Sequence, residues 1–189
     1  MIIKNIDVKL PEGLFKTEVI FFTIEDKLKL WNIYKNWRNL CDDLENLNAR
    51  KVNLPEGLSE SAFCLEMGFA RFTNSISGAN TSFDAYDTSN AKRIQLKACS
   101  ILPDLTSFGP KSIWDHIYFA DFFRNGEWDG SFDIYLIPND LIYNHKVNAL
   151  ETFKDQQIQK RRPRFSIYKE IINVAKILPV KVGQIDPNK

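Results

Sequence analysis

The sequence has little that would mark a membrane, secreted or metal–sulfur protein. No apolar run approaches the roughly 20 residues that a transmembrane helix needs, and residues 1–7 alternate apolar and charged side chains instead of forming the apolar core of a signal peptide. Cysteine occurs only three times, at positions without metal-ligand spacing. We therefore expect reduced thiols, a cytoplasmic location and no membrane partner.

The chain also lacks a strong charge of either sign and any internal repeat. Its formal net charge is +1, so a nucleic-acid partner would have to be bound by a local basic patch. The two histidines, His116 and His145, stand alone and are interpreted as structural. Hydrophobic residues make up 44% of the 189 residues, which is enough for one folded domain with a sizeable core.

A long amphipathic helix is predicted after Thr23, because Thr23 and Asp26 resemble a capping box and apolar residues then recur at steps of three and four up to Leu47. The helix either covers the core or forms a dimer contact, and Trp31 and Trp37 favour the second interpretation slightly because aromatic residues are enriched at interfaces.

A second helix is predicted from Ser59, as its N-cap, to about Thr73. Glu66 borders the apolar stripe of this helix, one turn from both Ala62 and Phe69. A carboxylate in this position can reach into a cleft beside a sheet, although the alternative is a simple solvated side chain.

The rest of the chain predicts several strands and a final helix, and therefore an α+β fold with an α/β-type core: a mixed β-sheet flanked by helices. The residues between the strands, such as 124–130, have turn chemistry. The expected elements are a hairpin over 82–97, strands over 117–123 and 132–137, the latter stopped by Pro138, and a helix over 166–176.

The hairpin carries the residues with the clearest chemistry. If its turn is centred on Ser89 and Asn90, Asp84 lies opposite Gln95, with Cβ atoms about 5 Å apart. Gln95 and Lys97 then share one face of the strand. Asp84, the Gln95 amide oxygen and the Leu96 carbonyl are oxygen ligands of the kind that Mg²⁺ takes. Lys97 could orient the attacking water or stabilise a phosphorane-like transition state.

This arrangement is what metal-dependent phosphodiester cleavage needs. The alternative is an ordinary hairpin with a polar outer face, since Asp, Gln and Lys are common at surfaces. A register slip of one residue would move the whole polar set to the other face of the sheet.

The hairpin resembles the PD-(D/E)xK nuclease superfamily in a Gln-x-Lys variant, with Phe83 where that superfamily often has proline. Further segments are similar to small type II restriction endonucleases of the Bsp6I type, over roughly residues 55–175. These segments are Ser77–Asp84, Arg93–Ala98, Asp104–Ser112 and Trp114–Phe122.

The resemblance implies a restriction-endonuclease-like fold and Mg²⁺-dependent cleavage of double-stranded DNA at GCNGC, by a homodimer with a cognate DNA methyltransferase in the same system. It implies one nuclease domain over 1–189, with a helical extension over 1–53, a catalytic core over 54–176 and a DNA-reading segment near 154–176. Asp84, Gln95 and Lys97 match its catalytic positions. Glu66 matches a helix carboxylate that many such nucleases add to the metal site, and it ranks above Asp87.

A basic segment is the predicted DNA reader, because Lys and Arg neutralise phosphates and Arg pairs with guanine. Ser166 could cap the helix that follows, and the turn at Gly109 and Pro110 offers further donors. A solvated basic loop is the alternative. The candidate DNA-binding residues are Ser107, Lys111, Ser112, Gln157, Gln159, Lys160, Arg161, Arg162, Arg164 and Ser166.

Two other functions remain open from the sequence. One is a repair or junction-resolving nuclease of the same superfamily, which would prefer branched or damaged DNA. The other is a non-catalytic DNA-binding protein that kept the fold, against which the presence of both Asp84 and Lys97 argues.

Overall fold

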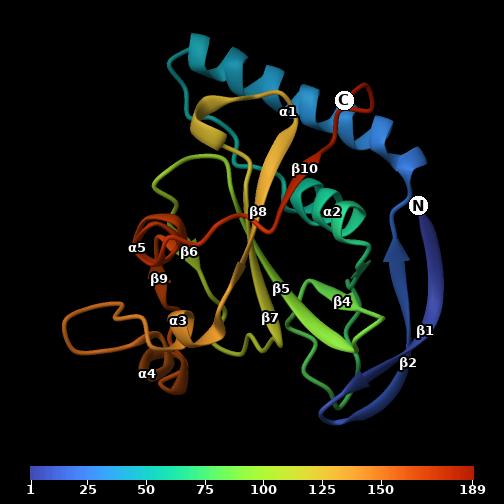
Figure 1. Cartoon of the computed structure of the whole chain (residues 1–189), viewed down its shortest axis with the longest axis vertical. Coiled ribbons are helices and arrows are strands. Elements are labelled where there is room, and N and C mark those ends of the chain that lie inside the picture. The colour runs from blue at the N-terminus through green and yellow to red at the C-terminus, as the bar shows by residue number, and fades with distance from the viewer.

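An eight-stranded mixed sheet organises the molecule, in the order β1-β2-β3-β4-β5-β7-β8-β10 (Figure 1). The structure is a computed structural model that describes all residues from Met1 to Lys189. Strands β5 and β7 are parallel, and the other neighbours are antiparallel. The strands are β1 (Ile2–Leu10), β2 (Gly13–Phe21), β3 (Ala70–Arg71), β4 (Ala85–Asp87), β5 (Lys92–Cys99), β7 (His116–Asp121), β8 (Ser131–Ile137) and β10 (Lys181–Gln184).

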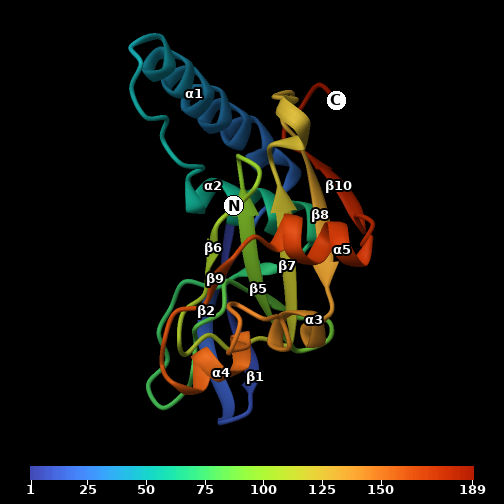
Figure 2. The same cartoon turned by 90° about the vertical axis from the view of Figure 1, so that its left-hand side faces the viewer.

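Helices cover both faces of the central strands, and β6 (Thr106–Ser107) and β9 (Arg164–Phe165) form a separate two-stranded sheet. On one face, α1 and α2 pack against alternate residues of β5, β7 and β8. On the other, side chains of α3, α4 and the segment 165–172 pack against the intervening residues (Figures 1 and 2). The helices are α1 (Lys27–Asn46), α2 (Glu56–Met67), α3 (Asn139–Tyr143), α4 (Phe153–Ile158) and α5 (Asn173–Ala175). The predicted α+β architecture with a mixed sheet is confirmed.

Residues 2–21 form a β-hairpin, so the helical extension expected over 1–53 is wrong for this part. Alternation of apolar and polar residues along Ile2–Leu10 suits a strand with one buried face, and Val8 and Leu10 are buried. The hairpin packs on β3, β4 and Phe83. The phenyl ring of Phe83 lies 4.6 Å from that of Phe72, which gives the residue at the proline position a packing role.

The long first helix is confirmed, beginning with a short 3-10 turn at Ile24–Asp26. The backbone N–H of Thr23 donates to the Asp26 carboxylate at 2.8 Å, as in a capping box. Trp37 is buried and Trp31 is partly buried against the same core, with its ring stacked on Tyr34 at 5.5 Å. The two tryptophans therefore give no support to a dimer contact.

The second helix is shifted from its predicted bounds. It begins at Glu56, with Pro55 rather than Ser59 at the N-cap, and it ends at Met67, with Gly68 as the C-cap, instead of at about Thr73. Gly68 has φ 71, a left-handed conformation that glycine adopts without a Cβ penalty and that commonly ends a helix. The helix predicted over 166–176 is a π-helical turn at Tyr168–Ile172 followed by α5.

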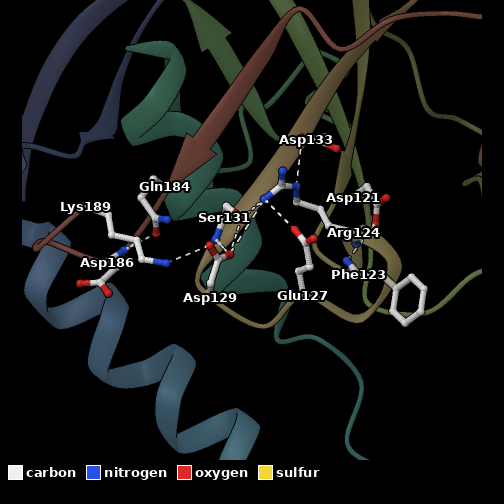
Figure 3. A network of polar contacts seen from close by, with 10 residues as sticks. All are labelled: Asp121, Phe123, Arg124, Glu127, Asp129, Ser131, Asp133, Gln184, Asp186 and Lys189. Carbon is white, nitrogen blue, oxygen red and sulfur yellow. Dashed lines mark hydrogen bonds and ion pairs between the residues drawn. The ribbon is translucent and has the colours of Figure 1, made fainter.

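The turn predicted between β7 and β8 is held by Arg124, whose guanidinium lies among acidic side chains (Figure 3). Its Nε is 3.2 Å from Asp133, and its Nη1 is 3.6 Å from Glu127. Lys189, near the C-terminal end, reaches Asp129 of the same cluster at 3.0 Å. The network thus connects residues that follow β10 to the turn that precedes β8. None of the helices combines the length and the apolar character that crossing a membrane requires.

Candidate active site

The predicted register of the β4–β5 hairpin is present. Ala85 pairs with Ile94 and Asp87 with Lys92, and the Asp84 N–H donates to the Ile94 carbonyl at 2.9 Å. The turn between the strands is closed by the Asp87 carboxylate, which accepts the backbone N–H groups of Ser89 at 2.9 Å and Asn90 at 3.2 Å. Asp84 is therefore opposite Gln95, and Asp87 is occupied in the turn.

Asp84 is held by the backbone of the neighbouring strand. Its Oδ2 accepts the N–H of Leu96 at 2.6 Å, and the same oxygen is in close contact with the Gln95 amide nitrogen. Burial raises the pKa of Asp84 to about 6, against the lowering effects of the Leu96 N–H and the Lys97 charge. The carboxylate is thus partly desolvated, and the nearby Lys97 charge does not fully compensate for its burial.

Gln95 is only 3% exposed, which an ordinary surface hairpin would not explain. Its amide nitrogen also lies 3.4 Å from the Leu96 carbonyl oxygen, so this N–H group sits beside two of the three predicted metal-ligand oxygens. The third, Gln95 Oε1, is buried without a hydrogen-bond partner. A buried orphan acceptor is costly.

These residues fit a divalent cation. The two ends of an amide are distinguished only through their hydrogen bonds, and turning the Gln95 amide over would bring its oxygen toward Asp84 Oδ2 and the Leu96 carbonyl. Three oxygens gathered in this way repel one another unless a cation lies among them, and oxygen is the ligand that Mg²⁺ takes. The structure brings no group of three or more His, Cys, Asp or Glu side chains into metal-binding proximity, so the fit depends on the amide and the carbonyl.

Lys97 completes the hairpin part of the site. It is half-buried, makes no ion pair, and its Nζ lies 5.4 Å from the centroid of the Phe108 ring. It lines a cavity of about 210 Å³ together with Leu54, Glu56, Ser59, Glu60, Leu96 and Ala98. This cavity is where the start of α2 meets the end of β5.

The helix carboxylates at the cavity are Glu56 and Glu60, one turn apart at the start of α2. Glu60 accepts a hydrogen bond from Arg71 Nε at 2.7 Å, yet burial raises its pKa to about 7, and the negative charge of Asp84 adds to the rise. The negative charge of Glu56 also raises the pKa of Asp84. Sequence reasoning missed both residues; their i, i+4 spacing places them on one face of a helix but does not show that this end of the helix lies over β5.

Glu66 lies elsewhere. It is at the other end of α2, where its carboxylate accepts the backbone N–H of Gln184 at 3.3 Å and lies 3.3 Å from Lys181 Nζ on β10. The structure does not bring it together with Asp84.

The two predicted DNA-contacting segments meet in space. Ser107 of β6 pairs with Arg164 of β9, and the Gln157 side chain donates to the Ser112 carbonyl at 3.0 Å. We call the surface formed by β6, β9 and the residues around them the basic surface. The buried carboxylate of Asp104 stabilises it by accepting hydrogen bonds from the Ser166 hydroxyl and the backbone N–H groups of Ile167 and Tyr168.

The candidate DNA-binding residues fall into two groups. Ser112 and Ser166 are buried, and Ser166 Oγ accepts the N–H of Lys169 in the predicted capping role. Arg161 is paired with Glu151 at 2.8 Å, whereas Arg162 and Arg164 make no ion pair. Ser107 and Gln157 are half-buried, and the exposed members are Lys111, Gln159, Lys160, Arg161, Arg162 and Arg164.

A second cavity, of about 310 Å³, lies between the β4–β5 hairpin and the segment that carries the candidate DNA-binding residues. It is lined at one end by Lys97 and Ala98 and at the other by Thr106 and Ser107. Candidate catalytic residues and candidate DNA-contacting residues therefore line the same cavity.

Comparison with known proteins gives a consistent picture. A family model described as Bsp6I restriction endonuclease matches residues 22–174. The chain is 35% identical over 168 residues to the type II restriction enzyme Bsp6I of Bacillus sp. (strain RFL6), covering 87% of this chain and 90% of that protein. No solved structure matches. The chain belongs to the Bsp6I restriction endonuclease family and is a type II restriction endonuclease.

Proposed function

We propose that this enzyme hydrolyses one phosphodiester bond in each strand of a short, near-palindromic site in double-stranded DNA, that the site is GCNGC, and that the centre is a Gln-x-Lys variant of the PD-(D/E)xK type. The observation that carries the proposal is the buried amide of Gln95, whose nitrogen contacts Asp84 and whose oxygen has no partner. An uncompensated amide beside a carboxylate is an expensive arrangement unless a ligand uses it.

Asp84, Gln95 Oε1 and the Leu96 carbonyl would hold the Mg²⁺ ion, with Glu60 in place of Glu66 as the helix carboxylate. When bound, Mg²⁺ supplies Lewis-acid stabilisation of the charge on the reacting phosphate. Gln95 brings no negative charge, so Glu60 would restore an acidic group to the set. Its bond to Arg71 keeps it positioned at the cavity.

Lys97 would act on the reacting phosphate itself. Its ammonium group lines the cavity and has no carboxylate partner in an ion pair, so it is available to a phosphate oxygen or to the attacking water. The Phe108 ring beside it limits solvent access on one side. A cation held at the reacting oxygens stabilises the extra negative charge of the pentacovalent transition state.

The exposed cations of the basic segment, with Ser107 and Lys111, would bind the DNA next to the cleaved bond. Two copies of the chain would cut the two strands, because one chain has one such centre and the proposed site is nearly symmetric. A cognate methyltransferase would protect the host sites, and both would act in the cytoplasm, where the DNA is.

The test is to incubate the purified protein with unmethylated plasmid and Mg²⁺ and to sequence the ends. Discrete fragments with a shared GCNGC end sequence would support the proposal. Cleavage of branched substrates alone would favour a junction-resolving enzyme, and DNA binding without any cleavage would favour a non-catalytic protein of the same fold. Cleavage at a different shared sequence would overturn only the assigned site.

A further inference from the structure

A cavity of about 380 Å³ that the site described above does not use lies between the end of α1 and the β7–β8 turn. Its interior is apolar and aromatic, with Trp37, Phe123 and Trp128 in its lining. The linker between α1 and α2 contributes two cations, Arg50 and Lys51. None of these residues contributes to the site described above.

This cavity adjoins the candidate active site. It shares Asn53, Ser100 and Ile101 with the 310 Å³ cavity, which in turn shares Lys97 with the cavity at the start of α2. The three hollows adjoin one another along a groove from Lys97 past the end of β5 to the α1–α2 linker. We call this feature the linker groove.

The charges at the far end of the linker groove are available to an anion. Arg50 is exposed and makes neither an ion pair nor a hydrogen bond. Lys51 is paired only with the exposed Glu45, at 2.8 Å, and such surface pairs contribute little. The Arg38 guanidinium lies 3.8 Å from the centroid of the Trp128 ring. This cation–π contact holds the Trp128 indole in place at the wall of the cavity.

We propose that the linker groove binds the phosphate backbone of the same DNA molecule beyond the recognition site, with Arg50 and Lys51 each neutralising a phosphate. The inference rests on the proposed function, because it takes the DNA strand at Lys97 as its starting point. A chain with a net charge of only +1 must gather its phosphate contacts locally, and this groove adds two cations to those of the basic segment. Because Trp128 lines the cavity, its fluorescence should change when DNA binds there.

The test uses the full chain carrying Asp84→Ala, with gels showing that the DNA stays intact. Affinity is measured by fluorescence anisotropy for two duplexes with the same GCNGC site, one with almost no flank and one with flanks of about ten base pairs, roughly one helical turn. Arg50→Ala with Lys51→Ala should weaken binding of the long duplex roughly tenfold and reduce its salt slope by about two, with little change for the short duplex.

Two matched variants complete the design. Lys16→Ala with Lys29→Ala removes the same charge from exposed positions outside the groove and should leave both affinities unchanged. Glu45→Gln frees Lys51 and should tighten binding of the long duplex a few-fold. The tryptophan emission of the parent should change with the long duplex, and Trp128→Phe should reduce this response.

Equal losses on both duplexes, or no loss on either, would overturn the inference. Failure of the proposed function gives a different pattern. A chain that cuts at one sequence but whose affinity ignores the flanks overturns only the linker groove. A chain that binds long duplexes through Arg50 and Lys51 and never cuts, without the Asp84 substitution, overturns only the nuclease proposal.

Discussion

The Asp84 carboxylate accepts the backbone N–H of Leu96 at 2.6 Å, across the hairpin that connects them. The acid of the candidate site is thus positioned by the main chain of the strand that also carries Gln95 and Lys97. A main-chain donor does not change rotamer, so the three side chains keep a fixed relation to one another as long as β4 and β5 stay paired.

Replacing Asp84 or Lys97 by alanine should lower the rate of plasmid cleavage by roughly a thousandfold or more, because each removes charge at the reacting phosphate. Specific binding, measured by anisotropy without Mg²⁺, should stay largely intact. Lys92→Ala is the matched control, since it removes an exposed charge of the same hairpin that takes part in no ion pair. Cleavage near the wild-type rate by either variant would show that the assigned centre is wrong.

Glu60→Gln should raise the Mg²⁺ concentration for half-maximal cleavage by roughly tenfold, as expected for a residue that supports a metal site. Glu66→Gln is the comparison, because Glu66 is engaged with Lys181 and Gln184. Thermal unfolding of both variants separates metal effects from loss of the Arg71 or Lys181 contact. If Glu66→Gln raised the Mg²⁺ concentration for half-maximal cleavage as much as Glu60→Gln or more, Glu66 rather than Glu60 would be the helix carboxylate of the metal site.

The affinity for Mg²⁺ should rise with pH between about 5 and about 8, because the pKa of Asp84 is raised to about 6 and that of Glu60 to about 7. Both carboxyl groups must lose a proton before they can bind a cation. Calorimetry in buffers of different ionisation enthalpy should detect protons released on binding near pH 6, and fewer near pH 8. Proton release that is the same at both pH values would contradict the raised pKa values.

The same groups predict how the stability of the metal-free protein depends on pH. Their folded-state pKa values lie above the usual values near 4, so the folded state holds more protons between about pH 4 and pH 7. Their contribution to the free energy of unfolding is therefore full below about pH 4 and is lost as the pH rises through 6 and 7. Mg²⁺ should raise the melting temperature more at pH 8 than at pH 5, and Asp84→Asn with Glu60→Gln should flatten both trends.

Asp104→Asn should destabilise the protein by about 2–4 kcal/mol, because an amide has one acceptor oxygen where the carboxylate serves Thr106, Ser166, Ile167 and Tyr168. DNA affinity should fall with it, since these bonds fix the basic surface. Denaturant unfolding and anisotropy measure the two effects. Asp140→Asn, in the first turn of α3, is the control and should change neither; an unchanged affinity in Asp104→Asn would separate the basic surface from its support.

The hairpin of the candidate site was predictable from sequence because all of its determinants are local. Asp87, Ser89 and Asn90 fix the turn, and the turn fixes the register that sets Asp84 opposite Gln95. The core helix after Thr23 was predictable for the same reason, since its cap and its periodicity lie within one segment.

The helix carboxylate was not predictable, because periodicity identifies the buried stripe of α2 but not which end of the helix lies over β5. Glu60 and Glu66 both border apolar residues, and only the packing of α2 separates them. The N-terminal hairpin was missed although Ile2–Leu10 has the alternating pattern of a strand. The pairing of Ser107 with Arg164 joins segments 57 residues apart and depends on the whole fold.

The attachment of the basic surface to Asp104 has a consequence for anyone who wishes to change the sequence that the enzyme cuts. Ser166 is a candidate donor for DNA, yet its hydroxyl donates to the buried Asp104 carboxylate, so it is a poor position to vary in a library. The side chains of Gln159, Arg162 and Arg164 are exposed and make no hydrogen bond to a buried group. If the proposed DNA-binding surface is right, variation confined to these three residues changes base preference while the fold stays intact.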